Sequence, residues 1–168
     1  MLITRKWAMP SHHTFKIYPI RDLLKRYVKG DGIDPFAGEN SPAVCSNDLN
    51  PSKPTKYHLE AVDFVKKMNE ARFMFDYALF DPPYSLRQIM ECYEGIGKTT
   101  DKKWATTKFY TDVKNELAKV IKPGGICISF GWNTIGLGKK RGFEIIEVLV
   151  VSHGRLHNDT LVTVETKL

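Results

Sequence analysis

The sequence predicts an α/β fold: a mostly parallel sheet with a C-terminal antiparallel strand pair and helices on both faces. Short apolar runs that suit buried strands alternate along the chain with amphipathic runs that suit helices. Such alternation is typical of right-handed crossovers between parallel strands. The last two apolar runs are joined only by SHGRLHN, which is short enough for an antiparallel pair. At 168 residues and 42% hydrophobic, we expect residues 1–168 to form one domain, with no separate target-recognition domain.

In the first half of the chain, a polar lead-in precedes the first element. Apolar spacing in PIRDLLKRYV predicts a helix over residues 19–28 that ends before Gly30. A third short strand is expected within YHLEA, before a helix over 62–71. Three further strands are expected around Ile33, over 43–46 and over 75–80. The last of them must stop at Asp81, because the prolines that follow cannot donate to a sheet ladder.

The second half begins with a long polar stretch, residues 85–108, which we expect to be a functional or mobile loop. A clear helix follows in YTDVKNELAKVI and is stopped by KPGG. NTIGLGKKRG has room for a turn of helix. The remaining strands are expected over 125–130, 143–151 and 159–167.

Composition limits the classes of partner and compartment. The chain carries 25 basic and 19 acidic residues, a net charge of +6, which favours a polyanionic partner without proving one. Its three cysteines are far apart and form no CxxC pair, which indicates free thiols in a reducing compartment. We find no signal peptide and no membrane span, so we expect a soluble, cytoplasmic protein that does not bind membranes.

The turns after the expected parallel strands differ in character from the turns before them. Those after the strands include DPFAGEN, NDLNP, DPPYS, GWN and SHGRLHN, whereas those before them are KGDG, NEARF, KPGG and KKRG. In open α/β sheets, ligands bind beyond the C-terminal ends of the strands. The sequence therefore predicts its site at that edge.

The first two of these turns suggest a nucleoside cofactor. Asp34, Pro35, Phe36 and Gly38 follow the first strand, and Asp48 ends the second, where an acid can accept from ribose hydroxyls. No GxGxxG follows, so a pyrophosphate is not expected. A cofactor with a positive centre and an amino-acid tail fits better, and S-adenosylmethionine has that composition. The alternative is that DPFAG is only a tight turn and Asp48 a helix cap.

Glu60 is a further candidate in this half of the site. It is expected at the end of the third strand, where it can accept from the amino group of adenine. A purely structural role is the alternative. Asp63 is better explained as an N-terminal helix acid, favoured by the helix dipole.

The stretch FDPPYS predicts the reactive chemistry. An exocyclic amine of a base is a poor nucleophile, because its lone pair is delocalised into the ring. The carboxylate of Asp81 and the carbonyl of Pro82 can hold its two N–H groups, while Tyr84 stacks on the base. Alignment of reacting groups of this kind contributes roughly 7–11 kcal/mol, and neither a metal nor a covalent nucleophile is needed. The alternative is a strand that simply ends at a Pro-Pro turn.

Residues 14–167 resemble the small phage- and prophage-type N6-adenine DNA methyltransferases that carry DPPY, in TFKIYPIRDLL, DPFAG, NDLNP, LFDPPYS, KPGGICISFGWN and HNDTLVTVE. The resemblance implies a Rossmann-like class I methyltransferase sheet and a bacterial or phage-infected host cell. It also implies that Asp81, Pro82, Pro83 and Tyr84 form the catalytic motif. Asp34, Phe36 and Gly38 would border the methionine part of the cofactor, and Asp48 would bind its ribose. The segment Thr14–Pro19 would close over the cofactor, with Phe15 and Lys16 as its contacts.

Two departures from the family pattern affect what the resemblance implies. Glu39 and Asn40 replace the family's glycine-rich ending of DPFAGxG. Only 42 residues separate Gly38 from Asp81, which leaves no room there for a target-recognition domain. We therefore expect low sequence specificity, or specificity supplied by a separate partner or a homodimer.

The stretch after DPPY is the best candidate for contact with nucleic acid, because it mixes cations with aromatic rings. Such a mixture suits a flipped adenine of a duplex or a single strand, although a solvated lid is the alternative. On the same rim, Trp132 is equally compatible with a place in the core, and the polarity of the 152–158 turn with a structural role. The candidate contacts are Arg87, Lys98, Lys102, Lys103, Trp104, Trp132, Asn133, His157 and Asn158.

Taken together, the sequence predicts an S-adenosylmethionine-dependent methyltransferase that acts on adenine N6 in DNA, at specific sites or without sequence preference. One alternative is an RNA enzyme that methylates an exocyclic amine of adenine or guanine, because DNA and RNA differ at the 2′-OH, which the motif does not read. Another is a cofactor-binding anti-restriction or regulatory protein without transferase activity.

Overall fold

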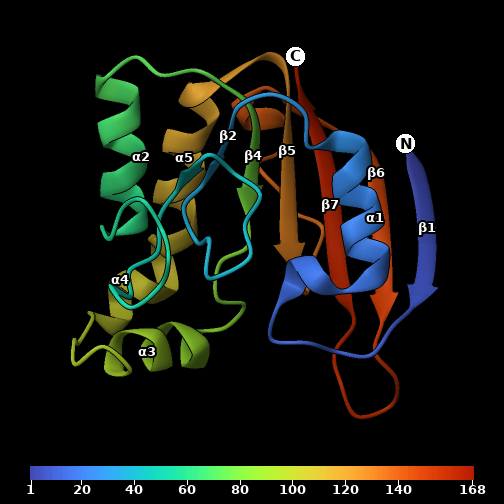
Figure 1. The fold of residues 1–168 in the computed structure, drawn as a ribbon, viewed down its shortest axis with the longest axis horizontal. Coiled ribbons are helices and arrows are strands. Elements are labelled where there is room, and N and C mark those ends of the chain that lie inside the picture. Colours follow the sequence, from blue (N-terminus) through green and yellow to red (C-terminus); the bar gives the residue numbers. More distant parts are fainter.

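A seven-stranded sheet runs through the whole chain (Figure 1). The structure is a computed structural model that describes all of residues 1–168. The strand order is β1-β6-β7-β5-β4-β2-β3. The strands are β1 (Leu2–Trp7), β2 (Gly32–Asp34), β3 (Cys45–Ser46), β4 (Phe75–Phe80), β5 (Ile121–Gly131), β6 (Phe143–Ser152) and β7 (Thr160–Lys167).

The predicted mixture of parallel and antiparallel pairing is confirmed. Every pairing in the sheet is parallel except those of β7, which runs antiparallel to both β5 and β6. The C-terminal ends of the other six strands therefore meet at one edge. Figure 1 shows this edge at the lower side, where the arrowheads of β1, β4, β5 and β6 point.

Helices cover the two faces of the sheet unequally. The helix α1 (Tyr18–Tyr27) lies on one face, and α2 (Ala61–Glu70) and α5 (Phe109–Val120) pack together on the other (Figure 1). Two shorter helices, α3 (Leu86–Glu94) and α4 (Lys102–Thr107), lie beyond the C-terminal edge of the sheet, below α5.

The core consists of two layers separated by the sheet. On one side, α1 contributes Ile20, Leu23 and Leu24, which pack with Leu79 and Ile128 of the central strands. On the other side, side chains of α2 and α5 pack against the opposite surface of the same strands. Five of the six residues of β4 are buried, so its continuous apolar sequence is that of a central strand. Asp81 follows this strand, which places it on a rigid support.

The polar lead-in is a strand, which the sequence analysis missed. Leu2–Trp7 pairs in parallel with β6 and forms one edge of the sheet. All but one of its residues are exposed, so the strand lacks the alternation of buried and polar positions that reveals a half-buried strand.

The predicted third strand in YHLEA is wrong. Only Tyr57 forms an isolated bridge there, with Asn47. The side chain of Asn47 satisfies the backbone instead, since its Oδ1 accepts from the Leu59 amide at 2.9 Å and its Nδ2 donates to the Leu59 carbonyl at 3.0 Å. These bonds take the place of a strand partner, and Glu60 becomes the residue that precedes α2.

The predicted long loop over 85–108 is largely helical. Ser85 caps α3 by accepting from the Gln88 amide, and Asp101 caps α4 by accepting from the Trp104 amide. Ile89 and Tyr93 of α3 pack on Ala105 and Phe109 in a small separate cluster. That cluster has only four buried members, so polar residues outnumber apolar ones and hide the helical pattern. The remaining helices match their expected positions within one or two residues, and none of the helices has the length and apolar character to cross a bilayer.

Candidate active site

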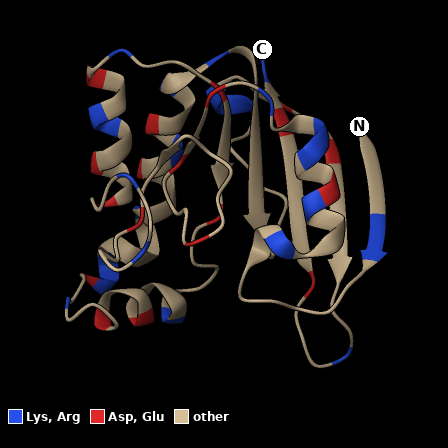
Figure 2. Cartoon of the chain, viewed as in Figure 1, with Lys and Arg blue, Asp and Glu red and all other residues tan.

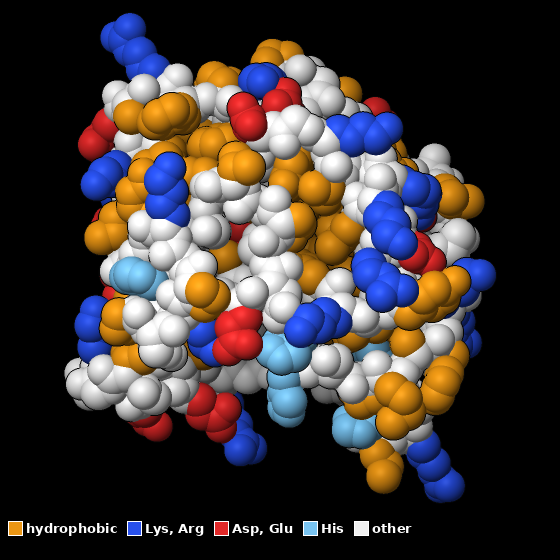
Figure 3. Space-filling model, in the orientation of Figure 1, with side chains coloured by type: hydrophobic (Ala, Val, Ile, Leu, Met, Phe, Trp, Pro, Cys, Tyr) orange, Lys and Arg blue, Asp and Glu red, His pale blue; other side chains and the backbone are white.

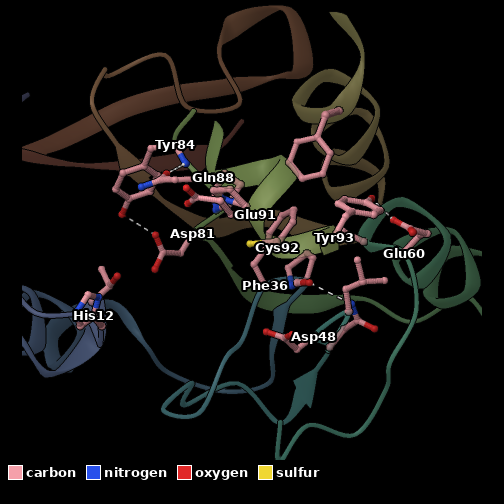
Figure 4. A pocket seen from close by; sticks show the side chains of 18 of the residues that line it. His12, Phe36, Asp48, Glu60, Asp81, Tyr84, Gln88, Glu91, Cys92 and Tyr93 are labelled. Carbon is pink, nitrogen blue, oxygen red and sulfur yellow. Dashed lines mark hydrogen bonds between the residues drawn. The ribbon is translucent and has the colours of Figure 1, made fainter. Parts of the chain in front are cut away.

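Two adjoining cavities open at the C-terminal edge of the sheet, at the position that the turns predicted. The first has a volume of about 580 Å³ and the second about 280 Å³. Both are lined by His12, Thr14, Phe36 and Asp81. The first also extends over Asp48, Glu60 and the DPPY residues, of which Figure 4 labels Asp81 and Tyr84. The second extends over Phe15, Ala37, Gly38, Glu39, Asn40 and Lys53.

The loop after β2 is organised around Asp34. Its carboxylate accepts from the Ser41 hydroxyl at 2.6 Å and from the Phe36 amide at 2.9 Å. The side chain is completely buried and lines neither cavity. Burial raises the pKa of Asp34 to about 7, although the bonds from Ser41 and Phe36 oppose that rise. As a correction to the sequence prediction, Asp34 shapes the loop that borders the cavity and does not line the cavity itself.

The rest of this loop does line the site. Pro35 and Phe36 face the first cavity, and Gly38 adopts a left-handed backbone, with φ of 56°. The amide of Gly38 donates to Oδ2 of Asp48 at 3.1 Å. Glu39 is paired with Lys53 at 2.7 Å, which lowers its pKa and offsets its charge. Glu39 and Asn40, the two residues that depart from the family pattern, both line the second cavity.

Asp48 and Glu60 lie together in the first cavity, as predicted for the nucleoside half (Figure 4). Asp48 also accepts from the Asn50 amide at 2.8 Å, so two backbone amides fix its orientation. Glu60 accepts from the hydroxyl of Tyr93, a residue of α3, at 2.5 Å. Leu49, Leu59 and Phe109 add apolar surface to the same wall. The arrangement offers acceptors for hydroxyl or amino groups beside a flat apolar surface.

Asp81 lies at the junction of the two cavities, half-buried. Its Oδ1 accepts from the Tyr84 hydroxyl at 2.6 Å. Burial raises the pKa of Asp81 to about 6, while hydrogen bonds from Tyr84 and Thr14 oppose the rise. A carboxylate offers about four acceptor positions, so Asp81 keeps acceptor capacity for a ligand beside these bonds.

The loop after Asp81 is held by two residues that the sequence analysis missed. The Gln88 side chain accepts from the Tyr84 amide at 2.6 Å, and the Tyr110 hydroxyl donates to the Pro83 carbonyl at 2.6 Å. Pro82 and Pro83 line the first cavity, and no hydrogen bond of the chain uses the Pro82 carbonyl. The only sequence signal for the Tyr84–Gln88 contact was the separation of four residues between them. No local signal identified Tyr110.

Of the two cofactor contacts predicted in the segment Thr14–Pro19, only Phe15 lines a cavity. Phe15 lines the second cavity, and its ring packs on Phe130 with a centroid separation of 5.3 Å. Lys16 follows it in the short 3-10 turn Thr14–Lys16, but lines neither cavity. His12 and Thr14, from the same segment, line both cavities and were not singled out from the sequence.

Most of the predicted nucleic-acid contacts are exposed, and three of them also contact a neighbouring side chain. Arg87 is paired with Glu91 at 2.7 Å, and Trp104 packs edge-on against Phe109. Trp132 is 43% exposed and packs edge-on against Tyr84, with 5.8 Å between ring centroids, so its alternative as a core residue is wrong. The other predicted contacts are all exposed: Lys98, Lys102, Lys103, Asn133, His157 and Asn158.

Comparison with solved structures shows the fold. The chain is similar to TrmN from Thermus thermophilus, with a TM-score of 0.58, 17% identity, and coverage of 90% of this chain and 49% of that one. It is also similar to SMU.776, described as a candidate methyltransferase and solved in complex with SAH. That match has a TM-score of 0.50, 12% identity, and coverage of 74% of this chain and 39% of that one. The chain thus spans half or less of the length of these two proteins.

No protein-family model matches the chain, and neither does any curated protein. The chain has a Rossmann-like methyltransferase fold, which confirms the predicted fold class.

Proposed function

We propose that this protein is an S-adenosylmethionine-dependent methyltransferase that acts on the exocyclic N6 amine of adenine in DNA. The observation that carries the proposal is the position of Asp81. It lies between a cavity lined by Asp48 and Glu60 and a second cavity bordered by the loop after β2, and its carboxylate keeps acceptor capacity for a ligand. A carboxylate at this junction can hold an amine beside a bound nucleoside cofactor.

The residues of the two cavities suit S-adenosylmethionine. Asp48 and Glu60 supply acceptors for ribose hydroxyls and the adenine amino group, and Phe36, Leu49 and Leu59 supply apolar surface for the ring. The second cavity, with Phe15, Gly38 and Asn40, takes the amino-acid tail. Burial raises the pKa of Asp81, and a sulfonium bound in the adjoining cavity would oppose that rise by favouring the charged form.

When bound, the cofactor supplies an electrophilic methyl group on a positively charged sulfur. Asp81 and the Pro82 carbonyl each accept one N–H of the target amine, which turns the nitrogen lone pair towards that methyl group. Tyr84 holds Asp81 through its hydroxyl and presents its ring to the base. Transfer would form the N–C bond as the carbon–sulfur bond breaks and its electron pair leaves with sulfur, and the Asp81 carboxylate can accept the proton that the methylated amine then releases.

The polymer and its sequence are the finer part of the proposal. We infer that the exposed lysines Lys98, Lys102 and Lys103 contact phosphates, and that Trp132 and Asn133 border the base pocket. His157 and Asn158 lie on the loop between β6 and β7 at the same edge. We also infer that sequence specificity is low or comes from a separate partner or a homodimer.

The test supplies methyl-labelled cofactor with single-stranded DNA, duplex DNA or RNA, and identifies the modified nucleoside by mass spectrometry. We expect N6-methyladenine in DNA. Transfer only to RNA would replace the DNA proposal with the RNA alternative. Tight binding of the cofactor product without transfer to any of the three polymers would favour the cofactor-binding alternative.

A further inference from the structure

The strand β1, which the sequence analysis missed, has its C-terminal end at the same edge of the sheet as the two cavities. Along that edge, the ends of the strands follow in the order β1, β6, β7, β5 and β4. Neighbouring strands are about 4.8 Å apart, so the row from Trp7 at the end of β1 to Asp81 after β4 spans about 19 Å. A stacked nucleic-acid strand has a phosphate about every 3.4 Å, so this row has the length of about five nucleotides.

The end of β1 is fixed against the loop that joins β6 to β7. The Ala8 amide donates to the Ser152 carbonyl at 3.0 Å, and Nδ1 of His153 lies 2.9 Å from the Ala8 carbonyl oxygen. The other ring nitrogen of His153 lies 2.8 Å from the Thr160 hydroxyl. The buried His153 is therefore structural. The indole of Trp7 reaches the same loop, because a Cβ on Gly154 would lie 3.9 Å from its Nε1.

The positive charges of β1 and of the β6–β7 loop are not neutralised by ion pairs. The first 21 residues contain Arg5, Lys6, Lys16 and Arg21 and no Asp or Glu. No salt bridge involves Arg5, Lys6 or Arg155. The only acid in the loop, Asp159, accepts from the Ser152 hydroxyl, to which Nε of Arg5 also donates at 2.9 Å. Figure 2 shows basic residues on the lower part of β1 and at the loop tip.

Exposed apolar side chains lie among these cations. Trp7 is 64% exposed, Leu156 is 90% exposed, and Trp132, farther along the same edge, is 43% exposed. Figure 3 shows hydrophobic side chains beside basic and histidine side chains at the lower right of the molecule. Exposed rings interleaved with cations are the features by which proteins hold single-stranded nucleic acid.

We propose that a single-stranded nucleic acid lies along this edge, from the cavity past Trp132 and the β6–β7 loop to Arg5, Lys6 and Trp7 of β1. We call this surface the β1 track. The inference rests on the proposed function, because it names the strandedness of the substrate and the path of its flanking nucleotides. The cations bind phosphates, and Trp7 stacks on a base several nucleotides from the reacting adenine.

A second copy of the chain fits this surface less well. Pairing two exposed edge strands through β1 in antiparallel fashion would bring Arg5 and Lys6 of both copies together. Like charges on paired strands are destabilising. A polyanion is complementary to the same residues.

The test measures binding of a fluorescent 12-nucleotide adenine-containing DNA strand, and of its duplex, by anisotropy between 50 and 200 mM salt without cofactor. We expect tighter binding of the single strand. Lys6→Ala with Arg155→Ala should reduce the slope of log affinity against log salt by about 1.4, since each phosphate contact contributes about 0.7. Trp7→Ala should weaken binding about 5- to 100-fold, and Trp7→Phe should retain most of the affinity.

A matched control removes two exposed lysines from the opposite edge of the sheet. Lys139→Ala with Lys140→Ala changes the net charge equally, but lies just before the start of β6, and should leave affinity and slope unchanged. The β1 track is wrong if the two double variants behave alike, or if duplex binds more tightly. It is also wrong if light scattering shows a dimer that Trp7→Ala dissociates, because β1 would then be a self-association surface.

Lys102→Ala with Lys103→Ala forms a further arm, which measures the contribution of α4 on the other side of the cavity. Methyl transfer is measured on the same preparations. Strand binding through the β1 track without transfer to any polymer would overturn the proposed function and leave the track standing. If methyl transfer occurs but the β1 variants bind the DNA strand as tightly as the wild type, the β1 track alone is wrong.

Discussion

The loops after β2 and β4 both begin with Asp-Pro, on adjacent strands at one edge of the sheet, yet the two carboxylates have different tasks. Asp34 is completely buried, and its oxygens are bonded to Ser41 and Phe36 of its own loop. Asp81 is half-buried, accepts from Tyr84 through one oxygen, and faces both cavities. The same dipeptide thus builds a loop in one place and presents an acceptor in the other. The difference in role follows from whether hydrogen-bond donors of the same loop occupy both oxygens of the carboxylate.

Replacing each of the two acids should distinguish the roles of the two loops most clearly. In Asp81→Asn, the Tyr84 hydroxyl retains the carboxamide oxygen, so an NH₂ group replaces the free acceptor and cannot hold the target amine. We expect transfer to fall about 10²- to 10³-fold, as for the loss of one preorganised charged contact. Binding of S-adenosylhomocysteine, measured by calorimetry, should stay within a few-fold.

Asp34→Ala should give the opposite pattern. It removes both bonds that close the loop after β2, so cofactor affinity and thermal stability should fall together. If Asp81→Asn loses cofactor binding as severely as Asp34→Ala, the division of tasks between the two loops is wrong.

The difference in burial predicts a difference in the pH dependence of stability. Burial raises the pKa of Asp34 to about 7 and that of Asp81 to about 6, from an ordinary value near 3.8. Between about pH 4 and 7 the folded chain therefore holds protons that the unfolded chain has lost, and the cofactor-free protein becomes less stable as pH rises through that window. The total effect of Asp34 is on the order of a few kcal/mol.

The measurement compares the melting temperature at pH 5.0 and pH 7.5 in the wild type and in two neutral variants of similar shape. Asp34→Asn should remove more of the pH dependence than Asp81→Asn, because its carboxyl has the higher pKa. An Asp34→Asn variant with the pH dependence of the wild type would show that Asp34 is already ionised in the folded protein.

The same two loops show what the sequence reveals and what it hides. Most of the central helices and strands, the polarity of the turns and the positions of Asp48 and Asp81 follow from local signals such as apolar periodicity and proline. The burial of Asp34 depends on Ser41, and Asn47 replaces a strand at Leu59 by bonding its backbone. Such contacts are made by side chains whose partners only the fold brings near.

The edge strand β1 was missed for a related reason. Its partner, β6, lies 145 residues away in the sequence, and exposed side chains leave no pattern of burial along β1. The charged residues of an edge strand carry little information about secondary structure, because edge strands commonly carry them to prevent aggregation. Only the fold shows that the C-terminal end of β1 lies at the same edge of the sheet as the two cavities.

The smallest expected effect concerns the tyrosines that support each half of the site. Tyr110 donates to the Pro83 carbonyl and supports the loop after β4, whereas Tyr93 donates to Glu60 in the nucleoside half. Tyr110→Phe should lower kcat about 5-fold with the cofactor KM unchanged, because one hydrogen bond is worth about 1 kcal/mol and its loss loosens the peptide that positions Pro82.

Tyr93→Phe is the matched change in the other half. It should raise the cofactor KM by a similar factor and leave kcat nearly unchanged, because it loosens Glu60 and not Asp81. Steady-state kinetics on the two variants therefore separate the roles of the two loops by the parameter that each variant changes. If both variants changed only KM, Tyr110 would support cofactor binding, and the Pro82 carbonyl would not need to be held in place for transfer.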